Sequence, residues 1–288
     1  MLPHRAGDFP GAGDRPGRQT LECALEEEYI VMLIGKFLGV VLTGLLSAIA
    51  PAVADALKDD AIARLAASHE PDIPLAVGRL AVKQAGLVAA RTLLAKRGRD
   101  AGLGRGWNAA APEWQDAEAH FSRMVDGVIA RGIENPEWLR AIWTDQAARV
   151  LNAEEADEIA THFATPIGRE QRIVVEVKVV GELLLTNYTF TDRISDRVPG
   201  SEREFARMQA IWAEREPFRV RNFDGDVGAA RFGSRNPGVK YVRMLAIQGV
   251  DAMLGHIDAV CAEAVLAVSQ AAAQADPFIE TYRRRSAN

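Results

Sequence analysis

The strongest constraint on the fold is an apolar seam near the C-terminal end of the chain. Apolar residues recur there at spacings of three and four, the period of one face of an α-helix: Ile247, Val250, Leu254, Ile257, Cys261, Val265 and Val268. A seam of this length predicts a long helix that packs against other helices or against a second copy of itself. The expected fold is therefore all-α, a multi-helix bundle with a long C-terminal helix.

Helix-start signals divide much of the remaining chain. The tripeptide Pro-Glu-Trp occurs at residues 112–114 and again at 136–138, and a proline followed by a glutamate suits the first turn of a helix. Asn152 and Glu155 have the spacing of a capping box. Ser201 is placed to cap a further helix. At the end of the chain, the basic run "YRRRSAN" reads as a solvated terminus.

Residues 171–190 form the ambiguous segment. Valines alternate there with charged residues, which is typical of a strand. A strand needs a partner, however, and the sole candidate lies around residues 239–242. No hairpin turn follows closely, so helix is the favoured interpretation.

Residues 32–54 have the three parts of a secretory signal peptide. Lys36 supplies positive charge, residues 37–50 are mostly apolar, and Ala52-Val53-Ala54 is typical of a cleavage site. Pro51 predicts a helix break just before that site. The alternative is an uncleaved membrane anchor, because eighteen residues lie at the lower limit of a span. Cleavage is favoured, which predicts a periplasmic or secreted protein with no stable membrane span after processing.

Residues 1–31 fit this signal poorly. They are rich in glycine, proline and arginine, and Glu26, Glu27 and Glu28 precede the apolar run where positive charge is expected. We predict that translation begins at Met32 and that residues 1–31 are a misassigned, disordered extension. The expected organisation is then a signal at 32–54 followed by one helical domain at 55–288.

The charge of this expected domain argues against nucleic-acid binding. The whole chain has 34 basic and 39 acidic residues, and those beyond residue 54 are 30 basic and 33 acidic. A nucleic-acid partner would require a dense positive face. Cys261 is the one cysteine beyond the signal, so packing rather than an internal disulfide must stabilise the domain.

One stretch, Leu151 to Gln171, resembles a known family. The sequence "LNAEEADEIATHFATPIGREQ" contains an acidic pair, an aromatic position and a Thr-Pro-x-Gly turn followed by a basic residue. This order resembles the DUF2059 family, small helical domains of exported bacterial proteins with no assigned function. The resemblance covers about residues 136–190, and His162 departs from it because two aromatic residues are usual at this point. The matching residues are Glu154, Glu155, His162, Phe163, Thr165, Pro166, Gly168 and Arg169.

Physical chemistry gives this stretch a structural role. Acidic residues in the first turn favour the positive end of a helix, Thr165 can cap the next helix, and Pro166 suits its first position. Gly168 leaves room for two helices to approach closely. The stretch therefore predicts a tight helix–helix corner, with ligand binding at this corner as the weaker alternative.

No metal site, cofactor or catalytic residue is predicted. Glu158 and His162 lie four residues apart, but a metal would need further ligands, so an ion pair is favoured. The run from Asn222 to Asp226 begins like a calcium loop, yet Val227 and Gly233 stand where that loop requires glycine and glutamate.

The sequence leaves three functional hypotheses. The favoured one is a non-enzymatic envelope protein that binds an unknown envelope protein or itself, with Trp138 and Trp143 as a possible partner surface. The second is an envelope hydrolase that uses His120, His162 or His256 with nearby carboxylates. The third is a carrier of apolar ligands between the Ala- and Leu-rich helices.

Overall fold

The computed structural model describes residues 49–190, 198–219 and 236–287. These residues fall within one compact unit, Ala48–Asn288. They form helices and connecting turns, and no strand occurs in these ranges. The all-α prediction is confirmed. The expected extension at 1–31 and most of the expected signal at 32–54 lie outside the described residues.

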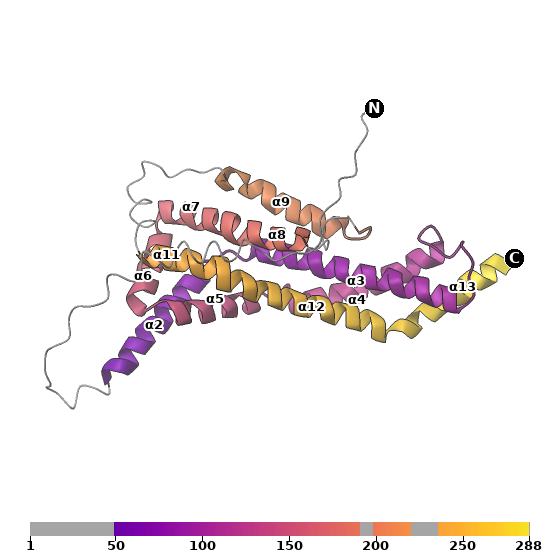
Figure 1. The fold of residues 1–288 in the computed structure, drawn as a ribbon, viewed down its shortest axis with the longest axis horizontal. Helices are drawn as coiled ribbons and strands as arrows, with labels where there is room; N and C mark the ends of the chain where they lie inside the picture. Colours follow the sequence, from indigo (N-terminus) through magenta and orange to yellow (C-terminus); the bar gives the residue numbers. More distant parts are fainter. Residues whose placement is uncertain (1–48, 191–197, 220–235, 288) are drawn as a thin grey trace, which may run out of the picture. The chain divides into compact units, whose positions relative to one another are not determined.

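Figure 1 shows the arrangement of the helices. Three of the segments are not regular α-helix: η1 and η2 are π-helices and η3 is a 3₁₀-helix. In chain order the elements are α2 (Ile49–Ser68), α3 (Asp72–Asp100), α4 (Pro112–Gly132), α5 (Glu137–Val150), α6 (Ala153–Ala164), α7 (Pro166–Val175), η1 (Glu176–Gly181), α8 (Glu182–Phe190), α9 (Glu202–Arg219), α11 (Asn236–Arg243), η2 (Met244–Gly249), α12 (Val250–Gln270), η3 (Ala272–Ala275) and α13 (Asp276–Ala287).

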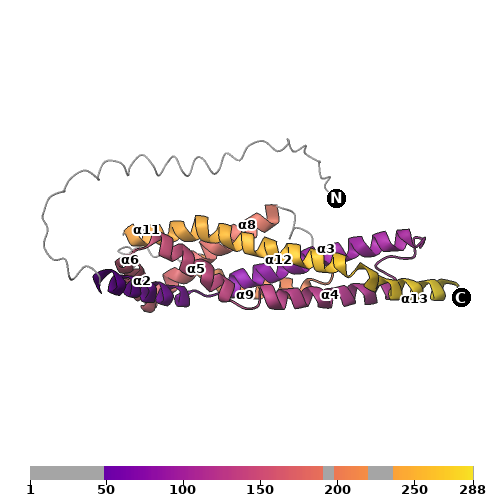
Figure 2. The ribbon, with the colours of Figure 1, turned by 90° about the horizontal axis from the view of Figure 1, so that it is seen from below.

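Helix α3 is the core of the bundle. It packs against α12, α4 and α9 (Figures 1 and 2), and its first half is buried almost without interruption. Around α2, the helices α5 and α6 form a second group, and α9 packs against α7 and η1. The hydrophobic core is continuous through these groups, so the described helices depend on one another for burial.

Two helices in the described ranges are long and apolar enough to cross a membrane, judged by length and composition alone. In α3, 83% of the apolar window is buried inside the protein, as expected for a core helix. The second runs continuously over Pro237–Gln270, and 33% of its window is buried. The two helices therefore differ in what covers them, although their compositions are similar.

Most of the predicted helix starts are confirmed. Helix α4 begins at Pro112, and α5 begins directly after Pro136. Asn152 and Glu155 form both hydrogen bonds of a capping box. Helix α9 begins directly after Ser201, whose hydroxyl donates to the carbonyl oxygen of Val198 at 2.6 Å.

The segment 171–190 is helical, and the strand alternative is wrong. Its valine-rich part forms the end of α7 and the π-helix η1 before α8 continues. A helix suits these apolar residues because it buries Val177, Val180 and Leu184, which follow at spacings of three and four, on one side. Packing against α3 and α9 thus overrides the local preference of valine for strands.

One other expectation needs correction. Pro51 does not break the helix, because α2 already begins at Ile49. At the third position of a helix the missing N–H has no intrahelical acceptor to lose. The basic terminus is exposed as predicted, although it lies in a helix, α13, where Arg285 donates to Glu113 of α4 through two hydrogen bonds of 2.6 and 2.9 Å.

The long C-terminal seam divides between two environments. Val250, Ile257, Cys261 and Val268 are buried against the bundle. Ile247 and Val265, in contrast, are 45% and 39% exposed. The predicted helix is therefore present, but its apolar side chains extend beyond the face that the bundle covers.

Candidate functional site

A buried polar cluster lies where α2 ends and α3 begins. The chain leaves the helix at His69, and Pro71 precedes the first residue of α3. The His69 side chain is 1% exposed, so this break directs an ionisable ring into the interior. A buried polar ring requires hydrogen-bond partners, and distant parts of the chain supply them.

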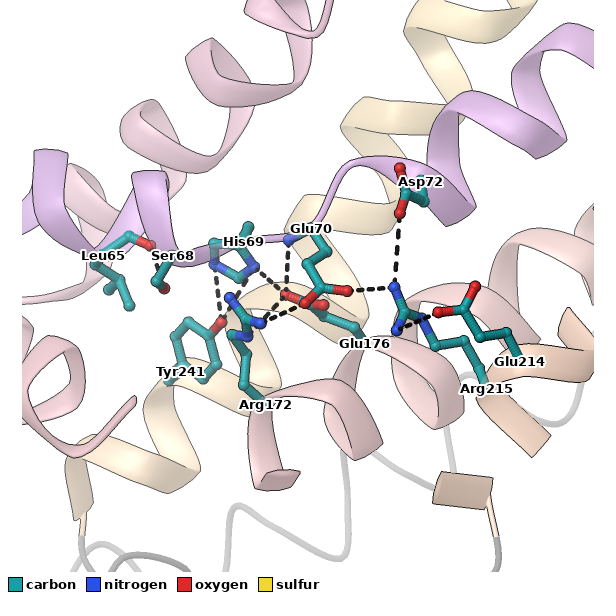
Figure 3. Close-up of polar contacts among 10 residues, drawn as sticks. All are labelled: Leu65, Ser68, His69, Glu70, Asp72, Arg172, Glu176, Glu214, Arg215 and Tyr241. Atoms are coloured by element: carbon teal, nitrogen blue, oxygen red, sulfur yellow. Dashed lines mark hydrogen bonds and ion pairs between the residues drawn. The ribbon is translucent and has the colours of Figure 1, made fainter. Parts of the chain in front are cut away.

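Glu176 and Tyr241 occupy the two ring nitrogens of His69 (Figure 3). Glu176 Oε1 lies 2.9 Å from Nδ1, and the Tyr241 hydroxyl lies 2.8 Å from Nε2. An ionised carboxylate can only accept, so the proton of the first bond belongs to Nδ1. The Tyr241 hydroxyl then donates to Nε2, which completes a carboxylate–imidazole–phenol chain.

Aromatic rings enclose this chain of hydrogen bonds. Trp143 stacks on the His69 ring at a centroid distance of 4.2 Å, and Phe163 meets the Tyr241 ring edge-on at 5.3 Å. Burial, together with the nearby charge of Glu176, raises the pKa of Tyr241 well above its ordinary value. The phenol therefore remains protonated at neutral pH and acts as a hydrogen-bond donor rather than as a nucleophile.

The two π-helices position the carboxylate and the phenol. Glu176 is the first residue of η1, and Tyr241 lies in the last turn of α11 just before η2. These two wide turns pack against each other. A π-turn shifts the phase of the side chains that follow it, and here the two shifts occur on either side of one polar cluster.

A layer of ion pairs covers the cluster on one side (Figure 3). Arg172 donates to Glu70 Oε1 at 2.7 Å, and Arg215 of α9 donates to Glu70 Oε2. Arg215 also lies 3.5 Å from Asp72. The backbone N–H of Glu70 points at Glu176 Oε1 from 3.4 Å, which connects the ion-pair layer to the cluster.

The space inside this arrangement is small. A cavity of about 10 Å³, lined by Glu70, Asp72, Ile73, Ile173, Glu176, Val177 and Arg215, has the room of about one water molecule. The carboxylate–imidazole–phenol chain has the order of groups found in catalytic triads, but this cavity has no room for a substrate. The geometry supports a structural junction that fixes α2, α3, η1 and α11 relative to one another.

The predicted helix–helix corner lies beside this cluster. Thr165 caps α7 by accepting from the Gly168 N–H at 3.0 Å, and Pro166 is the first residue of that helix. A Cβ at Gly168 would stand 1.8 Å from the carbonyl oxygen of His162, so this position excludes a side chain. Phe163 joins the corner to the cluster through its contact with Tyr241.

The acidic pair of the corner has a structural use. Glu155 closes the capping box of α6 and accepts a hydrogen bond from Lys240 of α11. Burial opposes the charge of Glu155, but Lys240 and the Asn152 N–H outweigh this and lower its pKa. Glu154 and Arg169 are exposed at the surface of the corner.

The other predicted site residues are dispersed. Trp143 is 3% exposed, so the expectation that it forms a partner surface is wrong: its ring is used to cover His69. Trp138 is half-buried and stacks on His256 at 4.2 Å. The Nε2 atoms of the three candidate hydrolase histidines each face an amide or carbonyl oxygen: His120 with Gln274, His162 with Gln171 and His256 with Gly132.

Sequence reasoning did not identify His69, Glu176 and Tyr241. Two signals were nevertheless present: a His-Glu-Pro run at a helix break, and a single glutamate inside a valine-rich run. A charged residue in an apolar run either marks an exposed face or requires a buried partner. Glu176 and Tyr241 lie 107 and 172 residues from His69 along the chain, a separation that no local pattern could reveal.

Comparisons add no relative to this description. No protein-family model, curated protein or solved structure matches the chain. Within the described ranges, no group of three or more His, Cys, Asp or Glu side chains is arranged to hold a metal ion. The resemblance of residues 136–190 to the DUF2059 family stays a prediction.

Proposed function

We propose that this protein is an exported, non-enzymatic helical module that binds another protein in the bacterial cell envelope. The binding surface is the outer face of α11, η2 and α12, which we call the α12 face. Export rests on the signal-like residues 32–54 of the sequence.

One observation carries the binding part of the proposal. Along the continuous helix Pro237–Gln270, large apolar side chains point away from the bundle: Val239, Ile247, Val265 and Leu266 are 50%, 45%, 39% and 55% exposed. Single exposed apolar residues are ordinary in soluble proteins, but four large ones on one long helix indicate an interaction surface. The opposite side of α12 is buried against the bundle, and this packing holds the helix in place.

The proposal is tested in cells by position-specific photo-crosslinking. A photoreactive residue at Leu266 of the full-length chain should give a covalent adduct in the envelope fraction. The matched control is Val88 on α3, which is 51% exposed but outside the α12 face. Adducts from both positions or from neither would overturn the binding surface.

Export is tested by sequencing the N-terminus of the same material. A processed chain that begins at residue 55 is the expected result. Full-length protein recovered from the cytosol would overturn the envelope assignment and leave the α12 face to be judged by the crosslinks.

A further inference from the structure

A cleft lies at the end of α3 that is remote from the His69 cluster. It is lined by residues of the last turns of α3, of the connector 101–111 and of the first turn of α4, and its volume is about 390 Å³. Pockets that bind small organic molecules have volumes of roughly 300–1,000 Å³. The cavity at the His69 cluster, of about 10 Å³, is far below this range. The cleft, unlike that cavity, has room for a small molecule.

Trp107 lines this cleft and is fixed by the protein around it. Its Nε1 donates to the carbonyl oxygen of Leu94 at 3.0 Å. Its ring meets the rings of Trp114 and Tyr282 edge-on, at centroid distances of 5.4 and 5.3 Å. A Cβ at Gly98 would overlap the Trp107 ring, so the ring lies directly on the backbone of α3. This wall of the cleft is formed before any ligand arrives, which reduces the entropy lost on binding.

Most polar groups of the cleft wall are used within the protein. The Trp114 Nε1 donates to Glu118 at 3.1 Å, so both indole N–H groups have acceptors in the chain. Asn108 lines the cleft too, but its side-chain amide donates to the carbonyl oxygen of Arg105 and accepts from the Ala110 N–H. Apart from glycines, the remaining uncharged lining residues are aliphatic: Ala95, Leu103 and Ala109. The wall therefore favours an apolar group.

Arg99 is the charged residue among those that line the cleft. It is exposed, and its guanidinium makes no hydrogen bond or ion pair with any residue that the structure describes. A guanidinium binds a carboxylate or a phosphate through two parallel N–H donors, a geometry that a lysine does not provide. Arg99 thus places a cation with free donors at the edge of an otherwise apolar cleft.

The charges around Arg99 also favour an anion. Residues 95–114 contain four basic and two acidic side chains. Arg97 is paired with Asp276 of α13. Glu113 is paired with Arg285, so neither of these two pairs adds net charge. The residues left in this stretch are three basic and one acidic: Lys96, Arg99, Arg105 and Asp100. The acidic one does not line the cleft.

We propose that this cleft binds a small amphiphilic anion, a molecule with an apolar chain or ring and one carboxylate or phosphate group. The apolar part lies against Trp107 and Trp114, and the anionic group pairs with Arg99. Both indole rings are recessed, at 7% and 6% exposed, so a single molecule that enters the cleft reaches them better than a flat bilayer surface does. The cleft shares no residue with the α12 face, and this inference goes beyond the proposed function without depending on it.

The test compares four ligands that have or lack these two parts. Octanoate has both, octanol and octyltrimethylammonium combine the same chain with a neutral or a cationic group, and acetate has the charge alone. Binding to the purified full-length chain is measured by isothermal titration calorimetry at concentrations below micelle formation. Octanoate should bind about tenfold more tightly than any of the other three. Absent binding of octanoate, or equal affinities for octanoate and octanol, would overturn the proposal.

A matched pair of arginine variants locates the anionic group. Arg99→Gln removes the cation from the cleft, so it should weaken octanoate about tenfold and leave octanol unchanged. Arg105→Gln removes the same charge from an exposed position of the connector that does not line the cleft, and it should change neither affinity. Similar losses in both variants would show an effect of overall charge and overturn the role of Arg99.

A third variant fills the cleft. Gly104 lines it, and a Cβ there would meet no atom within 4 Å, so Gly104→Leu adds a side chain without a clash. It should abolish binding of octanoate and octanol while the circular dichroism spectrum stays unchanged. Octanoate binding that this variant retains would overturn the assignment to the cleft. Sedimentation with phosphatidylglycerol vesicles that requires Arg99, without octanoate binding, would assign the cleft to a bilayer instead.

Discussion

The polar cluster around His69 and the α12 face reverse the usual distribution of side chains. At the cluster, a histidine, a glutamate and a tyrosine are buried, although ionisable groups are costly to remove from water. On the α12 face, isoleucine, valine and leucine are exposed. The buried polar groups have partners within the chain, and their hydrogen bonds are complete enough to fix four helical segments. The exposed apolar groups have none within the bundle, which leaves them available to another molecule.

This contrast predicts the largest loss of stability at the cluster. Glu176→Ala removes the acceptor for His69 Nδ1 and leaves a cavity in place of a carboxylate that lies beside Arg172. We expect the free energy of unfolding to fall by about 3 kcal/mol, measured by urea denaturation. The matched control is Glu137→Ala at an exposed pair with Arg140, which should cost less than about 0.5 kcal/mol. Similar losses in both variants would show that the cluster is not a structural junction.

Glycine substitutions compare packed and open backbone. Gly168→Ala places a methyl group against the His162 carbonyl, so α6 and α7 must separate, at a cost of about 2 kcal/mol. Gly255→Ala, on the α12 face, meets no neighbouring atom and should stabilise the helix by up to about 1 kcal/mol. Thermal unfolding of both variants measures these opposite signs. A destabilising Gly255→Ala would mean that the α12 face is more closely packed than it is in this structure.

Removing one hydroxyl tests the middle of the cluster. Tyr241→Phe preserves the ring contacts with Phe163 but removes the hydrogen bond to His69 Nε2. The expected loss is about 1 to 2 kcal/mol in the free energy of unfolding. In the double variant with Glu176→Ala the two losses should not add, because both groups act on the same ring. Simple additivity would show that the three side chains are not one unit.

The pH dependence of stability tests the role of Glu155 at the helix–helix corner. The folded-state pKa of Glu155 is lowered, so its contribution is present above the pKa of the unfolded chain and is lost as the pH falls through the folded value. Stability should therefore decline below about pH 4. Glu155→Gln retains the hydrogen-bonding pattern of the capping box and should reduce this decline when denaturant midpoints at pH 3 and pH 7 are compared. An unchanged decline would assign the acid sensitivity to other carboxylates.

The smallest effect on stability is expected at the α12 face. Leu266 is 55% exposed, so Leu266→Asn should change the free energy of unfolding by no more than about 0.5 kcal/mol. The same variant should nevertheless lose the partner crosslink formed from a photoreactive group at Ile247, near the other end of the α12 face. Loss of stability without loss of the crosslink would reverse the roles assigned to the two regions.

Local features were the part of the fold that could be predicted from the sequence. The capping box at Asn152, the Thr165 cap and the proline at the start of α4 were correctly identified, because each depends on residues within one helical turn. Gly168 was correctly associated with a close backbone approach for the same reason. Helix was correctly favoured over strand for the valine-rich residues 171–190. The π-helix that begins at Glu176 was not predicted.

The candidate site could not be predicted in the same way. Glu176 and Tyr241 each lie more than a hundred residues from His69 along the chain, and each of the three alone resembles an ordinary surface residue. Trp143 was given as part of a possible partner surface for the same reason, since a tryptophan is compatible with a core or an interface.

The sequence by itself determined that the chain is helical and where many of its helices begin, because caps, prolines and apolar periodicity act over three to four residues. The tertiary structure decided which sides of those helices are covered. The helical period of the sequence places Ile247, Ile257 and Val265 in one apolar seam. The neighbouring helices cover Ile257 and leave Ile247 and Val265 exposed, and the sequence does not indicate this difference. Burial is a property of the assembled bundle. For this reason the tertiary structure, and not the local sequence, determines both the buried polar cluster and the exposed apolar face.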